Sequence, residues 1–397
     1  MGFHILILIL IELILVSADN WAVLVCGSEY YWNYRHHADI AHAYHIMRRG
    51  GITEDHIITL MYNDIPFDPK NPFPGELYNR PGDDSPNVYE GVIVDYDLFS
   101  VSAENLIKVL TGDESAGGKV LKTTKDDNVF LFFSDHGGEE TLALPGGYLY
   151  SNDLLDAIKT MHEKQMYKKF LLYIEACYSG SMFLNLPEDW NIMAVTAAHD
   201  KESSWEWYCD DEAIVKGKNI GSCLGDEFSI SWMERVDNSD RKENLEDQFN
   251  YLVKQVTKSH VSRYGDTSFK NDSIGEFIGF ASSDHTPVEP HYSFKHWDSR
   301  DNKLLFLRYK ADHSSGVDKE KWESAVKEEL THRSSVDKYF SSLTSNPRYY
   351  QYSEGVKDFN CYKRAIDQFT SEFGMSDYGL KYFDVFANMC NEDSHAF

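Results

Sequence analysis

The sequence predicts an α/β domain built on a mainly parallel sheet, followed by a small domain made only of helices. Between Trp21 and Ala198, short apolar runs alternate with longer segments of helical periodicity. This alternation is typical of parallel strands covered by helices on both faces. A polar stretch with two prolines follows residue 282, and beyond Lys303 apolar residues recur only at helical spacing.

The elements of the α/β domain can be placed in order along the chain. The predicted strands are Trp21–Cys26, Ile57–Met61, Val129–Phe133, Phe170–Ile174 and Ile192–Thr196. The predicted helices lie near Ala38–Arg48, Ala103–Leu110, Asn152–Met161 and Asn244–His260. In sheets of this class, ligands bind beyond the carboxyl ends of the strands. The loops that follow the strands are therefore where we expect the site.

The domain boundaries follow from these patterns. We expect an α/β domain at 19–282, a linker at 283–302 and a helical domain at 303–397. Residues 1–18 resemble a secretory signal peptide, since an apolar run ends in Val16-Ser17-Ala18. The run is shorter than the ~20 residues of a spanning helix. These features predict the secretory pathway, with a lysosomal, vacuolar or extracellular destination and no stable membrane association.

Charge is distributed unevenly along the chain. The formal net charge is −26, of which residues 303–397 carry only −2. Such an acidic protein is not expected to bind nucleic acid or anionic membranes. A nearly neutral tail fits docking onto an acidic body, although an acidic surface kept for solubility explains the charge equally well.

The six cysteines follow no metal-binding spacing, so no metal is expected. In an oxidising compartment we expect two disulfides. Cys209 and Cys223 bracket one polar loop, and Cys361 and Cys390 bracket the last helical stretch. Cys26 lies in an apolar strand, where a buried free thiol is the simplest interpretation. Cys177 is then the one cysteine without an assigned structural role.

A histidine and a cysteine follow two of the predicted strands. Val129–Phe133 runs into Ser134-Asp135-His136-Gly137, and Phe170–Ile174 runs into Glu175-Ala176-Cys177. A thiol with a pKa near 8.5 needs a positioned imidazole to become a nucleophile at low pH. Glycine after His136 allows the Gly137 N–H to approach a developing oxyanion. The pair predicts a cysteine peptidase that needs no cofactor; a buried structural cysteine and an unrelated histidine are the alternative.

Six motifs in order along the chain resemble the legumain family, the asparaginyl endopeptidases. They are Asn33-Tyr34-Arg35-His36, Ser134–Gly137, Glu175-Ala176-Cys177, Glu202-Ser203-Ser204, Leu224-Gly225-Asp226 and Ser259-His260-Val261. The tail resembles the family's inhibitory prodomain. The resemblance implies a caspase-like core, an acidic compartment and autoactivation at low pH.

The resemblance also implies residue roles. It makes Cys177 the nucleophile, His136 the base and Asn33 the residue that orients the imidazole. Residues implied for the pocket of the residue before the cut are Arg35, His36, Glu175, Ser203 and Asp226. A carboxamide offers one acceptor and two donors, so a cation and carboxylates together suit asparagine. Ionised aspartate is repelled there, which predicts cleavage after Asp only at low pH.

The tail is interpreted as an inhibitory cap over the cleft, released at low pH and acting as an intramolecular partner. An ordinary second domain is the alternative. Candidate activation cleavage points are Asp298, Asp301 and Asn302, and Asn271-Asp272-Ser273 is a glycosylation sequon.

Protein and peptide substrates are expected. Three other functions remain open: peptide ligation at the same cysteine, the catalytic subunit of a lipid-anchor transamidase, and a non-catalytic binding protein on the same scaffold.

Overall fold

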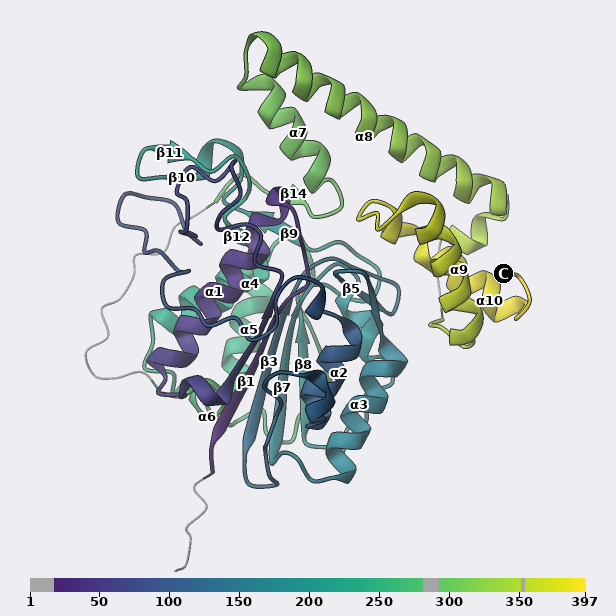
Figure 1. Cartoon of the computed structure of the whole chain (residues 1–397). Helices are drawn as coiled ribbons and strands as arrows, with labels where there is room; N and C mark the ends of the chain where they lie inside the picture. The colour runs from purple at the N-terminus through teal and green to yellow at the C-terminus, as the bar shows by residue number, and fades with distance from the viewer. Residues whose placement is uncertain (1–17, 281–292, 351–353) are drawn as a thin grey trace, which may run out of the picture.

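A six-stranded sheet forms the centre of the larger domain (Figure 1). The computed structural model describes residues 18–280, 293–350 and 354–397; the predicted signal peptide and the linker prolines Pro287 and Pro290 lie outside these ranges, apart from Ala18. The strands in spatial order are β13 (Ser262–Gly265), β8 (Ile192–Thr196), β7 (Lys169–Glu175), β3 (Asn128–Ser134), β1 (Asn20–Cys26) and β2 (Ile57–Met61). All pairs are parallel except that of the edge strand β13.

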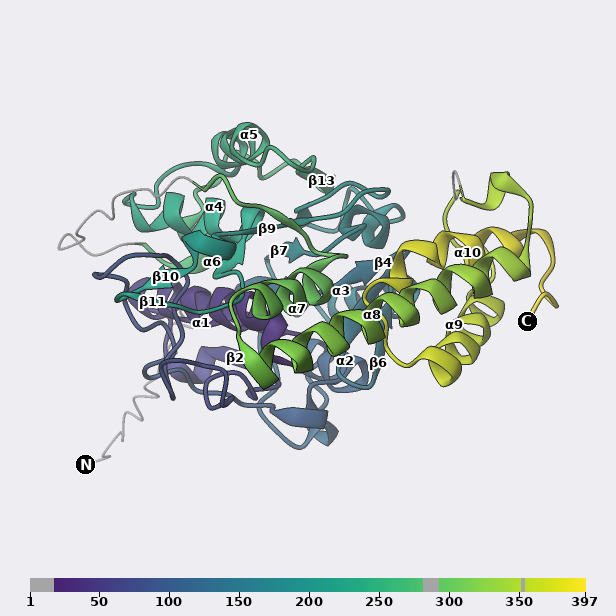
Figure 2. The ribbon, with the colours of Figure 1, turned by 90° about the horizontal axis from the view of Figure 1, so that it is seen from above.

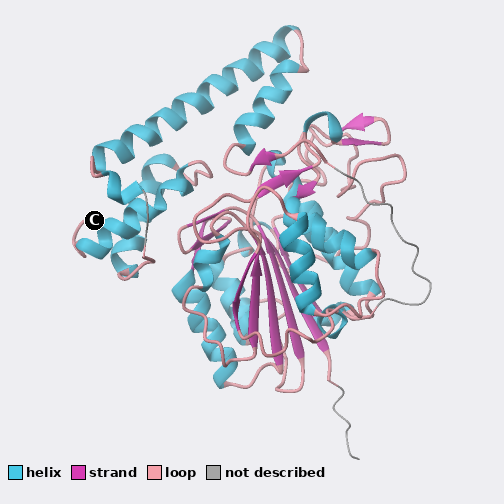
Figure 3. Ribbon diagram, turned by 180° about the vertical axis from the view of Figure 1, so that it is seen from behind, coloured by secondary structure: helices cyan, strands magenta, loops and turns pink. Residues whose placement is uncertain are grey.

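Helices cover both faces of this sheet, as Figures 1 and 3 show. One face carries α1 (Tyr34–Arg49), α4 (Glu227–Asp237), α5 (Leu245–Gln255) and α6 (Gly275–Ile278). The other face carries α2 (Ala103–Thr111) and α3 (Ser151–Glu163). Two separate apolar clusters result, one on each side of the strands.

Local sequence sets where these helices begin and end. Ser102 caps α2 by accepting a hydrogen bond from the Asn105 N–H at 3.2 Å, and Asn244 caps α5 through the Asp247 N–H at 2.7 Å. Gly112 ends α2 with a positive φ of 70°, a conformation that glycine adopts without strain.

Two small sheets lie at the carboxyl ends of the main strands. One contains β4 (Gly137–Gly138), β5 (Thr141–Leu144) and β6 (Gly147–Tyr150). The other contains β12 (Gly225–Asp226), β9 (Trp205–Trp207) and β14 (Trp297–Asp298). The second joins the linker to the α/β domain, because β14 pairs antiparallel with β9.

The tail consists of helices that extend across these carboxyl ends (Figure 2). Its α-helices are α7 (Asn302–Asp312), α8 (Gly316–Leu343), α9 (Phe359–Phe373) and α10 (Phe383–Glu392). A third apolar cluster joins Tyr148 and Tyr150 of the α/β domain to Phe369 and Phe383 of the tail. The tail is therefore packed onto the body through an apolar core.

The predicted fold class and all five predicted strands are confirmed. Helix α4, the edge strand β13 and the small sheets were not predicted. Within the described ranges, no helix is both long and apolar enough to cross a membrane.

Candidate active site

The sheet register brings His136 and Cys177 to matching positions on neighbouring strands. Ser134 at the end of β3 pairs with Glu175 at the end of β7. His136 and Cys177 each lie two residues beyond this pair, and both are buried. The juxtaposition predicted from the strand ends is therefore produced by strand pairing.

His136 is oriented by an amide. Its Nε2 lies 2.9 Å from Asn33 Oδ1, and Asn33 Nδ2 donates to the Glu29 carbonyl at 2.9 Å. Because a carboxamide oxygen only accepts, Nε2 carries the proton and Nδ1 is the basic nitrogen. Burial, and then Arg35 and Arg300, lower the pKa of His136 well below its usual value. The imidazole is thus neutral, as a general base must be.

Cys177 lies against the segment that follows β8. Its Sγ accepts a hydrogen bond from the Ser204 N–H at 3.3 Å and lies 3.7 Å from Ser204 Oγ. Burial raises the pKa of the Cys177 thiol, an effect that Arg300 partly offsets. In this capped state the sulfur is a thiol and not a thiolate.

Gly137 lies close to the backbone of the nucleophile segment. A Cβ at this position would lie 2.5 Å from the Cys177 carbonyl oxygen and 3.1 Å from that of Thr141. Only glycine fits at these distances, so the backbone of Gly137 lies next to the backbone of Cys177.

A fully buried charged pocket surrounds Arg35. Its Nε donates to Asp226 Oδ1 at 2.8 Å, and His36 Nε2 lies 3.5 Å from Asp226 Oδ2. Burial opposes the charge on Arg35, but Asp226 and then Glu206 outweigh it and raise the arginine pKa. The other nitrogen of His36 lies 2.8 Å from Ser28 Oγ.

The remaining predicted pocket residues occupy different places. Glu175 is buried, and its Oε2 accepts hydrogen bonds from the Ser229 N–H at 3.0 Å and Oγ at 2.9 Å. Ser203 is only half-buried and lines a hollow with Tyr178 and Asp301. Its neighbour Ser204 is the serine that contacts Cys177.

One pocket residue was missed by sequence analysis. Glu206 is fully buried, and its Oε1 lies 3.3 Å from Arg35 Nη1. Burial raises the pKa of Glu206 well above its usual value, although Arg35 opposes this. The signal was available: Glu206 is the charged residue between two tryptophans in the apolar segment that follows Ser204.

The linker lies in the cleft as an added strand. Trp297 of β14 pairs with Glu206, and the Ser299 N–H donates to the Ser204 carbonyl at 3.3 Å. Arg300 places its guanidinium 5.1 Å from the Tyr178 ring centroid, next to the nucleophile segment. The linker thus extends this small sheet by strand addition beside the nucleophile segment.

The three candidate cleavage points differ in accessibility. Asp298 is half-buried in β14, and Asp301 forms an ion pair with Arg333. Asn302 is buried at the start of α7, and its Nδ2 donates to Asn33 Oδ1 at 2.9 Å and to the Trp32 carbonyl at 2.8 Å. The bond after Asn302 lies in the first turn of α7.

The tail completes the cover over the site. Asp377 Oδ2 lies 3.5 Å from His136 Nε2, and Lys363 Nζ lies 2.7 Å from both carboxylate oxygens of Asp153. Tyr362 donates a hydrogen bond to the Glu139 carbonyl. A cavity of about 550 Å³ remains beside His136, lined by residues of both the body and the tail and partly open to solvent.

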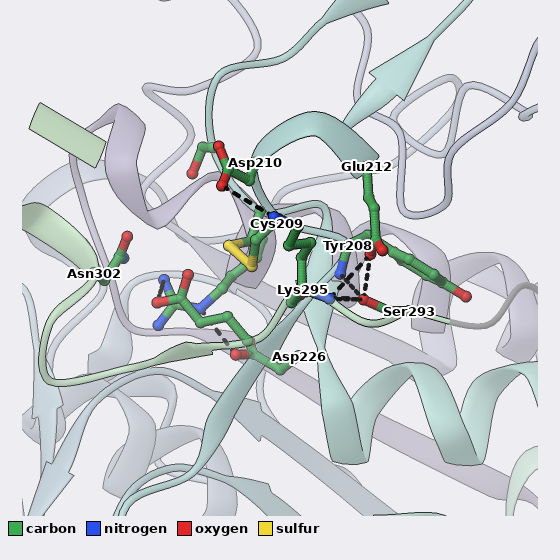
Figure 4. The surroundings of a disulfide bond; sticks show 12 residues. Tyr208, Cys209, Asp210, Glu212, Asp226, Ser293, Lys295 and Asn302 are labelled. Carbon is green, nitrogen blue, oxygen red and sulfur yellow. Dashed lines mark hydrogen bonds and ion pairs between the residues drawn. A yellow bond between two sulfur atoms is a disulfide. The ribbon is translucent and has the colours of Figure 1, made fainter. Parts of the chain in front are cut away.

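Both predicted disulfides are present, Cys209–Cys223 and Cys361–Cys390, and Cys26 and Cys177 are free and buried. A carboxylate oxygen of Glu206 lies within 4.8 Å of the sulfurs of Cys209 and Cys223, and Figure 4 shows the surroundings of this disulfide, among them Asp226 and Asn302. The first disulfide therefore constrains the loop between β9 and β12, which carry Glu206 and Asp226.

Asn271 of the predicted glycosylation sequon is exposed.

Comparisons with known proteins give matches to both the α/β domain and the tail. The peptidase C13 family matches residues 20–280, and the legumain prodomain matches residues 324–396. A vacuolar-processing enzyme delta-isozyme of Arabidopsis thaliana is 37% identical, covering 94% of this chain and 87% of its own length. A hemoglobinase of Schistosoma mansoni is 41% identical over 74% of this chain and 67% of its own length. A solved structure of caspase-1 from Spodoptera frugiperda matches 67% of this chain and 94% of its own length, with a TM-score of 0.40 and 10% identity.

Proposed function

Because the chain belongs to the peptidase C13 family and is a legumain-type cysteine endopeptidase with a prodomain, we propose that it cuts peptide bonds after asparagine. The observation that supports this most directly is the register of β3 and β7, which sets His136 and Cys177 side by side. The second support is the Arg35 pocket, whose mixed charges suit a carboxamide.

In the proposed reaction, His136 Nδ1 takes the thiol proton of Cys177 while Sγ attacks the carbonyl carbon after the P1 residue, the residue before the cut bond. Asn33 keeps the imidazole in the required tautomer. The N–H groups of Gly137 and Cys177 hold the oxyanion. His136 then protonates the leaving amine, and water releases the acyl group from sulfur.

We propose further that the chain is inactive until the tail leaves in an acidic vacuolar or lysosomal compartment. The buried His136 supports this. Burial, and then Arg35 and Arg300, lower the pKa of His136 in the capped state, and departure of the tail relieves part of that burial, so the released state binds more protons as pH falls. Acidification therefore favours release through this group.

The test compares matched fluorogenic peptides with Asn, Asp or Arg at P1, assayed after mild acid incubation. We expect Asn-selective turnover by the wild type and a loss of at least 10³-fold in Cys177→Ala. Cys26→Ala is the matched control, because it removes the other free thiol. Turnover that survives in Cys177→Ala, or none in acid-processed wild type, would reject the proposal.

A further inference from the structure

Glu206 presents a buried carboxylate that the fold itself does not use. The side chain is fully buried, and across the described ranges neither of its oxygens accepts a hydrogen bond. Arg35 lies 3.3 Å away but without hydrogen-bond geometry. Leaving a buried carboxylate in this condition is costly, so its retention requires an explanation.

The strand geometry shows where this carboxylate points. Ser204 directly precedes β9 and continues its pairing with β14 through the Ser299 N–H. Alternate residues of such an extended stretch share a face, so Ser204 and Glu206 point the same way. Ser204 Oγ lies 3.7 Å from Cys177 Sγ, which fixes that face as the one next to the nucleophile. Ser299 lies opposite Ser204, with the two hydroxyl oxygens 3.5 Å apart. A chain that replaces Ser299 therefore sends its side chain to the face that carries Glu206.

The other two pocket carboxylates are each engaged through one oxygen, while Asp226 Oδ2 and Glu175 Oε1 have no hydrogen-bond partner among the described residues. Asp226 Oδ1 accepts from Arg35 Nε, and Glu175 Oε2 accepts twice from Ser229. In contrast, both oxygens of Glu206 and the Nη2 of Arg35 are unmatched in the part of the chain that the structure describes. One cationic donor and one free carboxylate side by side complement the single acceptor and two N–H donors of a carboxamide.

We propose that Glu206 determines the specificity of this pocket by accepting an N–H of the P1 asparagine while Arg35 donates to its carbonyl oxygen. This assignment rests on the proposed function. It also accounts for the exclusion of aspartate, because an ionised carboxylate at P1 offers Glu206 only acceptors and a like charge.

The charges around Glu206 change when the cleft opens. Arg35 and Asp226 face it from the α/β domain, whereas Asp298 and Asp377 face it from the linker and the tail. Asp377 leaves with the tail, whereas Asp298 lies on the α/β side of a cut after Asp298, Asp301 or Asn302. Loss of Asp377 removes one of the negative charges that raise the pKa of Glu206, whose largest cause is burial, while Arg35 continues to lower it.

The test is a competition between the matched Asn and Asp peptides in one tube at pH 6, where the P1 Asp is ionised. The relative rates give the ratio of kcat/KM values without knowledge of the active enzyme concentration, so a lower folding yield does not affect the result. The enzymes are acid-processed wild type, Glu206→Gln, which keeps the shape, and Glu206→Ala. Asp211→Ala serves as control, since this nearby carboxylate is 75% exposed.

We expect the Asn-to-Asp ratio to fall tenfold or more in Glu206→Ala and to fall less in Glu206→Gln, whose amide oxygen still accepts. Asp211→Ala should leave the ratio unchanged. An unchanged ratio in both Glu206 variants, with an Asn-selective wild type, would overturn the assignment. A wild type without Asn selectivity would instead overturn the proposed function.

Discussion

The Arg35 pocket and the tail interface both surround the active site, but they are held in different ways. Arg35, Glu206 and Asp226 are fully buried within one domain, on α1 and two strands of a small sheet. The tail is held by an apolar cluster and by half-exposed contacts such as Lys363 with Asp153, whose side chains are 30% and 33% exposed.

This difference in contacts distinguishes the Arg35 pocket, which we expect to stay intact during activation, from the tail, which we expect to leave. Buried charges in a low dielectric interact strongly, and removing one partner is costly. Half-exposed ion pairs contribute little and weaken with salt and with pH. The pocket's ion pairs thus lie within the α/β domain alone, so the proposed departure of the tail would break none of them.

The largest expected effect comes from the permanent region. Arg35→Met leaves Asp226 and Glu206 buried without their cation, which we expect to cost about 3–5 kcal/mol of stability. Differential scanning calorimetry at pH 7 should show a Tm lower by about 6–20 °C. Asn turnover should also be lost. Because burial raises the pKa of both carboxyl groups, protonation relieves the penalty, and the Tm difference should narrow as pH falls.

Arg49→Met is the matched control on the same helix. Arg49 is also paired with a carboxylate, Asp237, but its side chain is 47% exposed. The expected cost is at most about 1 kcal/mol. Equal losses in the two variants would contradict the distinction between the two regions.

Features that depend on contiguous sequence could be predicted, whereas those that depend on pairing between distant segments could not. The strands were predictable because Val129–Phe133 and Phe170–Ile174 are continuous apolar runs, and parallel pairing then brings the residues after them together. Cys177, His136 and both disulfides followed from local patterns. These features can be recognised from residues that are neighbours in the sequence, such as an apolar run and the residues directly after it.

Glu206 and the course of the linker could not be predicted in this way. Glu206 becomes a pocket residue only because β9 pairs with β12 and β14, which come from distant parts of the chain. Two-residue strands such as β12 and β14 carry no periodic signal. For the same reason the sequence could not distinguish Ser203 from Ser204, since strand direction decides which one faces Cys177.

A change in Tm of intermediate size is expected from Asp377, which belongs to the tail and lies next to His136 of the α/β domain. Burial raises the pKa of Asp377 to about 6, close to His136. Between about pH 4 and 6 the folded state therefore binds more protons than the unfolded state, so this group's contribution to stability falls as pH rises through that window. Asp377→Asn removes the penalty. In a Cys177→Ala background, which prevents self-cleavage, Tm should rise by a few degrees at pH 7 and stay unchanged at pH 4.

The exposed Asp367 on α9 provides the control, since Asp367→Asn should not alter the pH profile of Tm. A Tm shift of the same size at pH 4 and pH 7 in Asp377→Asn would show that this carboxyl group does not titrate where the tail meets His136.

The smallest expected effect belongs to the half-exposed ion pair of the cap. Lys363→Ala removes the contact with Asp153 and the ammonium group 4.7 Å from the centroid of the Tyr150 ring. Pairs exposed to this degree contribute about 0.2–1 kcal/mol. In the Cys177→Ala background we therefore expect Tm to fall by no more than about 3 °C at low salt, and by less at about 0.5 M salt, where the charges are screened. Lys327→Ala, at an exposed position of α8, should change neither value. A larger loss that persists at high salt would mean that Lys363 acts through packing, and that the cap is held more like the pocket than its half-exposed ion pairs indicate.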